Sequence, residues 1–186
     1  MTATVALVKA RPEPGAVGAN QAAILQYARQ ADQLGAAVIV FPELMLTGIG
    51  PDSPAADDDL RRLADEALTD LARTLDRDGL GGRHLVVGTT GTGLANLPVN
   101  AAAVLHKGKV ELEVTDQDTR PMAVFAARGQ RFGLALGRAA PGGGRAGDLD
   151  AVLVLADQAA HVSDLAGNRV GPAAPEHDGL TLCRVG

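Results

Sequence analysis

The chain has 186 residues, of which 46% are hydrophobic and 2% aromatic, and a formal net charge of −5 from 22 acidic and 17 basic residues. This length and apolar content predict one compact domain with a core of Ala, Val and Leu, and they exclude a disordered chain. The acidic balance, with no run of Lys and Arg, argues against a nucleic-acid partner. The sequence has no signal peptide pattern and no apolar run of about 20 residues, so we expect a cytoplasmic protein with no membrane partner.

The first quarter of the sequence predicts a strand, a helix and a second strand. Residues 2–9 form a short apolar run that ends before Pro14-Gly15, as expected for a buried strand. From residue 18 to 34, apolar residues recur at every third or fourth position, which predicts an amphipathic helix, and Gly35 follows where helices commonly end. Residues 36–41 are a continuous apolar run typical of a strand buried on both faces.

The middle of the chain predicts a second helix followed by strands. Asp57-Asp58-Asp59 places acidic residues at the start of a helical pattern that runs to about residue 75. A short loop containing Gly108 predicts that the two strands flanking it form a hairpin. The expected strands are residues 84–89, 99–105, 110–114, 122–126, 132–136 and 151–156, with short strands in the tail from residue 159.

This order of elements predicts an α/β layered domain with a mixed sheet, because strands and helices alternate first and hairpins with little helix follow. We expect the two helices to lie together on one outer face of a central sheet. A second sheet, built from the hairpin and the tail, is expected against the inner face. The core of the central sheet is expected to contain Val5, Leu7, Val38, Val40, Val86, Leu134 and Val152.

Phe41-Pro42-Glu43-Leu44, followed by Leu46-Thr47-Gly48, resembles the opening of the nitrilase superfamily, the carbon–nitrogen hydrolases, and is nearest to the glutaminase domain of glutamine-dependent NAD synthetase. The resemblance covers residues 4–136 and implies a single nitrilase-like domain over 1–186. Its expected fold is a shortened α-β-β-α sandwich with mixed sheets, in which residues 137–186 form a pared-down second half. Further matches follow in the same order at Gly18-x-Asn20, Gly35-Ala36, Val86-Val87-Gly88-Thr89, Asn100-Ala101-Ala102 and Gly108-Lys109-Val110.

The resemblance also implies a catalytic set of Glu, Lys and Cys that hydrolyses amides or nitriles. In this chemistry a cysteine thiolate attacks the carbonyl carbon, the glutamate moves the proton, and the lysine supports the oxyanion. Only the glutamate is present here, as Glu43, which the resemblance makes a vestigial catalytic residue. Asp116 stands at the family's lysine position and Gly137 at the position of its nucleophile. A carboxylate repels a developing oxyanion, and glycine has no side chain that could attack.

These departures predict a non-catalytic nitrilase-fold protein, a pseudoenzyme that acts as a structural or regulatory partner. Two alternatives stay open. One is a hydrolase-like enzyme with altered chemistry, which would use Glu43 with Asp116, Asp118 or Arg138. The other is a small-ligand binder that uses the old active-site pocket. For Glu43 itself, the simplest interpretation is a buried acid that is hydrogen-bonded to nearby backbone.

The cysteine and the histidines have structural interpretations. Cys183 is the only cysteine, which excludes an intrachain disulfide, and it is interpreted as a small buried hydrophobic residue and not as a nucleophile. His84, His106, His161 and His177 lack the sequence spacing of known metal motifs. We therefore expect no metal and no cofactor, and we place each histidine on the surface or at a strand end.

The shortened second half predicts association. No helix pattern after Gly137 is long enough to cover the sheet, so aliphatic surface is expected to remain exposed. We expect a homo-oligomer, or a hetero-oligomer with a biosynthetic or amidase-type enzyme, whose interface includes the strand of residues 151–156 or its neighbours. The composition, rich in Ala, Gly, Arg and Asp, suggests a bacterial source.

Overall fold

The computed structural model describes residues 2–117, 123–136, 149–155, 160–164, 168–171 and 179–186. Gly137, Asp118, Arg138 and His177 therefore lie outside the described residues. The helices are α1 (Val17–Gln33) and α2 (Asp58–Arg77), and the strands are β1 (Ala3–Val8), β2 (Val38–Val40), β3 (His84–Thr92), β4 (Pro98–His106), β5 (Lys109–Thr115), β6 (Ala123–Ala127), β7 (Gln130–Leu136), β8 (Ala151–Leu155), β9 (His161–Ser163) and β10 (Leu180–Val185).

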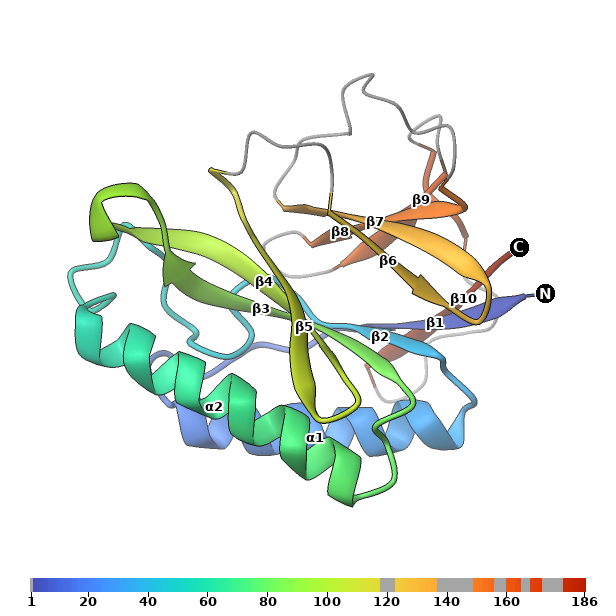
Figure 1. The fold of residues 1–186 in the computed structure, drawn as a ribbon, viewed down its shortest axis with the longest axis horizontal. Coiled ribbons are helices and arrows are strands. Elements are labelled where there is room, and N and C mark those ends of the chain that lie inside the picture. The colour runs from blue at the N-terminus through green and yellow to red at the C-terminus, as the bar shows by residue number, and fades with distance from the viewer. Residues whose placement is uncertain (1, 118–122, 137–148, 156–159, 165–167, 172–178) are drawn as a thin grey trace.

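The described strands form two sheets (Figure 1). The first has the order β10-β1-β2-β3-β4-β5, and the second has the order β6-β7-β8-β9. Within the first sheet, β1, β2 and β3 run parallel, whereas β4, β5 and β10 pair antiparallel with their neighbours. The second sheet is mixed as well, because β7 and β8 run parallel, whereas β6 and β9 pair antiparallel with their neighbours. The expected α/β class with mixed sheets is confirmed.

Both helices cover the same face of the first sheet, as expected (Figure 1). Strand residues such as Ile39 and Leu85 pack there against helix residues such as Ile24 and Leu71. The acidic start of α2 acts as a cap, because the Asp57 side chain accepts a hydrogen bond of 2.8 Å from the backbone N–H of Leu60. Neither helix combines the length and apolar composition that crossing a bilayer requires.

The second sheet packs against the other face of the first sheet. The apolar cluster between the sheets joins β1, β2 and β3 to β6, β7 and β8. The expected core residues Val5, Leu7, Val38, Val40, Val86 and Leu134 all lie in this cluster. Val152 is buried as expected but lies outside the cluster, because its neighbours Ala151 and Leu153 take the face that meets the first sheet. Through the described residues, the layers therefore run helix, sheet, sheet.

The sequence-based assignment of strands to sheets is wrong in several places. The hairpin of β4 and β5 extends the first sheet, since β4 pairs with β3 from Leu85↔Leu105 to Thr92↔Pro98. β10, from the tail, pairs with β1 in the first sheet, and Leu134 and Val152, which were expected in the central sheet, belong to the second. Strand pairing depends on tertiary packing, which the period of a single strand does not report.

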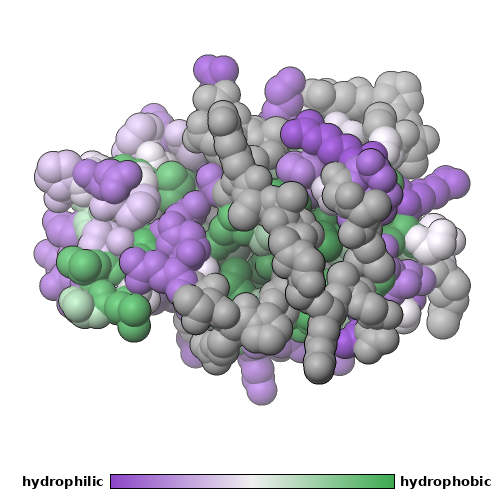
Figure 2. All heavy atoms as spheres, turned by 90° about the horizontal axis from the view of Figure 1, so that it is seen from above, coloured by the Kyte–Doolittle hydropathy of each residue, from purple (hydrophilic) through white to green (hydrophobic). Residues whose placement is uncertain are grey.

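β8 does not offer the exposed surface on which the expected interface rests. All residues of Ala151–Leu155 are buried within the single chain, and β8 lies between β7 and β9. Figure 2 shows hydrophobic residues at the end of the molecule that carries the β3–β4 turn. The turn residues Leu94 and Leu97 are 78% and 58% exposed, but single exposed leucines are ordinary on protein surfaces. The expected exposure of aliphatic surface is thus wrong for residues 151–155, and association itself stays a prediction.

Candidate functional site

Glu43 lies in a turn that directly follows β2, at the end of the parallel strands where α/β sheets commonly place ligand sites. Two backbone hydrogen bonds connect this segment to β3. Phe41 N–H donates to the Val86 carbonyl at 2.9 Å, and Leu46 N–H donates to the Gly88 carbonyl at 3.0 Å. Glu43 is half-buried, whereas its simplest interpretation from the sequence was a buried acid.

Gly88 allows the Glu43 turn to lie directly on the sheet. A Cβ atom at position 88 would lie 2.3 Å from the Pro42 carbonyl oxygen, 2.6 Å from Glu43 Cα and 2.8 Å from the Leu44 nitrogen. These are backbone atoms, which cannot rotate away as a flexible side chain can. Leu44 has a φ of 55°, a conformation that is uncommon outside glycine. The turn is therefore constrained from within and from the strand beneath it.

Asn20, on α1, fastens the same turn to the loop between β1 and α1. Its Nδ2 atom donates to the Leu46 carbonyl at 3.0 Å and to the Glu13 carbonyl at 2.8 Å, and its Oδ1 atom accepts from Glu13 N–H at 2.8 Å. The side chain is 3% exposed, so each bond satisfies a group that water does not reach easily. Asn20 belongs to a matched motif, but its bridging role required the positions of both loops.

Asp116 lies just beyond β5, exposed to solvent. Its N–H donates to the Asn100 carbonyl at 2.9 Å, which extends the β4–β5 pairing by one bond. It follows Val114 by two residues, so it shares the face on which Val114 meets the second sheet. The row Gly88, Ala102 and Val114 connects β3, β4 and β5. Asp116 is thus two strands away from β3, the strand on which the Glu43 turn lies.

Cys183 is remote from Glu43. It lies on β10 opposite Val5 of β1, and Val5 in turn pairs with Val38, at the start of the strand that leads to Glu43. Cys183 is 1% exposed, and burial raises the pKa of its thiol. A buried thiol of raised pKa is a poor nucleophile, because the thiolate is the attacking species.

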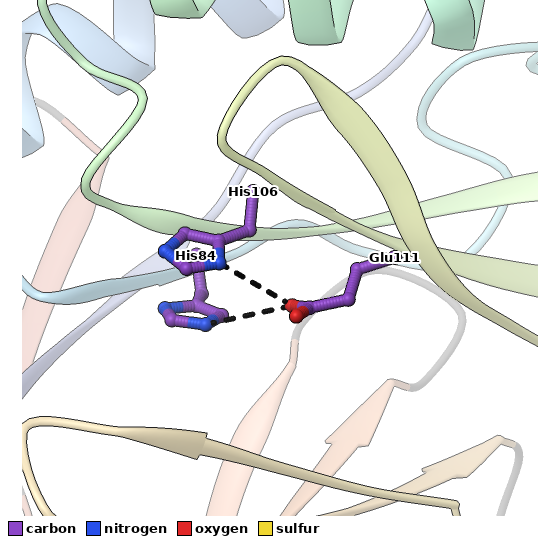
Figure 3. A group of neighbouring side chains, drawn as sticks. All are labelled: His84, His106 and Glu111. Carbon is purple, nitrogen blue, oxygen red and sulfur yellow. Dashed lines mark ion pairs between the residues drawn. The ribbon is translucent and has the colours of Figure 1, made fainter.

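A second polar site lies at the beginning of β3, on the face that meets the second sheet (Figure 3). The imidazole rings of His84 and His106 are stacked, with centroids 3.8 Å apart and planes at 20°. Glu111 Oε2 lies 3.4 Å from His106 Nδ1 and 3.7 Å from His84 Nε2. Both histidines occupy strand ends as expected, but their spacing in the sequence gave no sign that they meet each other and Glu111.

A β-bulge brings Glu111 to this face. Leu105 pairs with Val110, whereas the preceding Val104 pairs with Leu112, so Glu111 has no partner in the ladder. Val110 packs toward the helices and Leu112 toward the second sheet. The extra residue between them turns Glu111 toward the histidines, which is a common use of bulges. Alternation counted back from Val114 and Leu112 would have placed it on the helix side.

His84 is the buried member of this site. Its ring stacks on Phe125 of β6, with centroids 5.2 Å apart, and its side chain is 7% exposed. Burial, assisted by the neighbouring His106, lowers the pKa of His84 to about 4, although Glu111 acts in the opposite direction. The imidazole is therefore neutral at neutral pH. Neutral imidazole is the form that binds metal ions.

An open cavity of about 820 Å³ lies on the helix side, between α2 and β5. Asp65 and Glu113 both line it. Burial raises the pKa of each carboxyl, and the charge of Asp65 raises that of Glu113 further. Its lining residues include neither Glu43, nor the histidines, nor Cys183. It is a polar surface recess with no assigned chemistry.

No protein-family model and no curated protein sequence matches the chain. Solved structures do match it. The glutamine-dependent NAD⁺ synthetase of Acinetobacter baumannii, in complex with adenosine diphosphate, matches with a TM-score of 0.76 at 18% identity, over 99% of this chain and 45% of that one. The corresponding synthetase of Cytophaga hutchinsonii matches with a TM-score of 0.68 at 12% identity, over 99% and 43%. The chain thus spans less than half of these synthetases.

An amidase from Nesterenkonia sp. matches with a TM-score of 0.69 at 16% identity, over 98% of this chain and 89% of that one. A variant of that amidase is described as belonging to the nitrilase superfamily. In another variant, the acetamide moiety of fluoroacetamide is added covalently at the active site cysteine. Together these likenesses show the fold, which is the one expected from the Glu43 motif and its companions.

Proposed function

We propose that this chain, which has the fold of the nitrilase superfamily, does not hydrolyse carbon–nitrogen bonds and acts as a structural or regulatory binding partner. The observation that carries the proposal is the position of its only cysteine. Cys183 is buried on β10 and separated from β2 by β1, whereas Glu43 follows the far end of β2. Hydrolysis through a thioester requires a thiolate beside its base, and this pair does not meet that requirement.

The charge at the expected lysine position supports the same proposal. Asp116 shares a sheet face with the strand row beneath the Glu43 turn, and a carboxylate there opposes the negative charge that develops on a carbonyl oxygen during attack. Even a nucleophile supplied at Gly137, which lies outside the described residues, would lack its electrostatic partner.

The intact Glu43 turn favours ligand binding as a second candidate function. Gly88 permits its close contact with β3, Asn20 holds it with a buried hydrogen bond to the Leu46 carbonyl, and Leu44 keeps a strained conformation. Strain of this kind persists only where surrounding structure holds it, and it is common in ligand sites. A pocket that binds small amides without cleaving them would explain why a carboxylate stands at this strand end.

Ammonia release tests the proposed function. We expect the purified chain to release no ammonia from glutamine, simple amides or nitriles above the level of a Glu43→Ala variant. Gly137→Cys alone should stay equally inactive, because Asp116 still replaces the lysine. An active amidase assayed alongside confirms that the panel can report turnover. Turnover by the wild-type chain that disappears in Glu43→Ala would overturn the proposal.

A further inference from the structure

The three donor atoms of His84, His106 and Glu111 are spaced almost as a metal ion requires. Zinc lies about 2.0–2.2 Å from nitrogen and oxygen ligands, so two neighbouring ligand atoms of a tetrahedral site are about 3.3 Å apart. Glu111 Oε2 is 3.4 Å from His106 Nδ1 and 3.7 Å from His84 Nε2. All three atoms lie within 4.8 Å of one another. Only a modest contraction separates this arrangement from a coordination shell.

The two histidines differ in how far they can adjust. The two ring planes are nearly parallel, and each nitrogen lone pair lies in the plane of its own ring. An ion bound by both rings therefore requires one ring to turn. His84 is held between His106 and Phe125, whereas His106 ends β4 beside a two-residue turn and is 14% exposed. Glu111 has a side chain that is 49% exposed and free to approach. His84 can therefore act as the fixed ligand, while the other two close on the ion.

The ring nitrogens of both histidines are available to bind a metal ion. Within the described part of the chain, no imidazole nitrogen of His84 or His106 makes a hydrogen bond, and Glu111 contacts them only at ion-pair distances. Two imidazole rings and one carboxyl group suit a transition-metal ion, whereas Mg²⁺ and Ca²⁺ prefer shells made of oxygen atoms.

We propose that His84, His106 and Glu111 form a binding site for one divalent transition-metal ion, with Zn²⁺ as the probe. The ion would connect β3, β4 and β5 and, through His84 and Phe125, the edge of the second sheet. Three protein ligands leave a coordination position for solvent, as in sites where zinc binds or activates a further molecule. The site shares no residue with the Glu43 turn, so it stands whether or not the chain hydrolyses amides.

Zinc titration of the untagged chain, first freed of metal by a chelator, tests this site. We expect one Zn²⁺ per chain by calorimetry, no binding of Mg²⁺, and a higher melting temperature with zinc, because an ion bound only by the native state stabilises it. Glu111→Gln and His106→Ala should each weaken zinc binding at least about 100-fold, since even partners of metal ligands contribute about 10–100-fold. Neither variant should gain thermal stability from zinc.

Matched controls separate this site from adventitious binding. Glu113→Gln changes a carboxylate on the same strand that lines the helix-side cavity, and His161→Ala changes a histidine on β9. Both should bind zinc as the wild type does. Circular dichroism without metal tests whether Glu111→Gln and His106→Ala fold as the wild type does. Failure of the wild type to bind one ion, undiminished binding by Glu111→Gln and His106→Ala, or equal loss in the controls would overturn the proposal.

Discussion

Gly88→Ala is expected to lower the free energy of unfolding by about 3 kcal/mol or more. Overfilling a packed region typically costs about 1–3 kcal/mol, and the upper end applies where backbone must move. The added Cβ would lie 2.3 Å from the Pro42 carbonyl oxygen and 2.6 Å from Glu43 Cα, so the Glu43 turn must lift from β3 or the strand must bend. Urea unfolding followed by circular dichroism measures the loss.

Gly18→Ala is the matched control for this change. A Cβ at position 18 meets no atom within 4 Å, and the residue lies in the first turn of α1. Alanine is favoured over glycine in helices by up to about 1 kcal/mol, so this variant should be as stable as the wild type or slightly more so. A Gly88→Ala variant within about 0.5 kcal/mol of the wild type, the range of neutral surface changes, would contradict the close contact between the turn and β3.

Phe132→Ala is expected to lower the free energy of unfolding by about 3–5 kcal/mol, the usual range for a buried phenylalanine. Phe132 is fully buried between the two sheets and stacks on Phe125 with centroids 5.6 Å apart. The chain has 3 phenylalanines in total, so the surrounding core is aliphatic and branched and cannot easily fill the space left. Such a loss is a large part of the stability of an ordinary domain.

Val124→Ala on β6 provides the comparison. Val124 is 39% exposed and pairs with Gly133, the neighbour of Phe132, so its truncation removes little buried surface. We expect a loss below about 1 kcal/mol, as for partly exposed side chains. If Phe132→Ala cost no more than Val124→Ala in the same urea titration, the second sheet would not pack on the first as described.

The secondary structure could be predicted from the sequence because its signals are local. The pattern of residues 18–34 corresponds to α1, Val17–Gln33, and the hairpin loop holds Lys107 and Gly108 at φ values of 48° and 72°, as a tight two-residue turn requires. Such local signals could not predict that β10 and the hairpin belong to the first sheet. It depends on contacts between segments far apart in the chain.

The two candidate sites also differ in how far the sequence could predict them. The Glu43 turn could be placed at a strand end from its motif. The contacts of Gly88 and Asn20 with this turn could not be predicted, because they depend on how the loops are positioned. The histidine site could not be predicted, because the bulge at Glu111 breaks the alternation along β5, and the sequence does not show where that break lies. A one-residue irregularity in a strand leaves no periodic trace in a short sequence window.

Covalent trapping tests directly whether the folded chain has an activated nucleophile. Fluoroacetamide carries a poor leaving group, so an activated thiolate is needed to displace it, and intact mass spectrometry reports every adduct on the whole chain whatever its natural ligand. Iodoacetamide applied to the unfolded chain should label Cys183, the only cysteine, and so verify the detection. We expect the folded wild-type chain and Glu43→Ala both to keep their mass in fluoroacetamide. A single adduct on the folded wild-type chain that is absent from Glu43→Ala would show that the chain has an activated nucleophile.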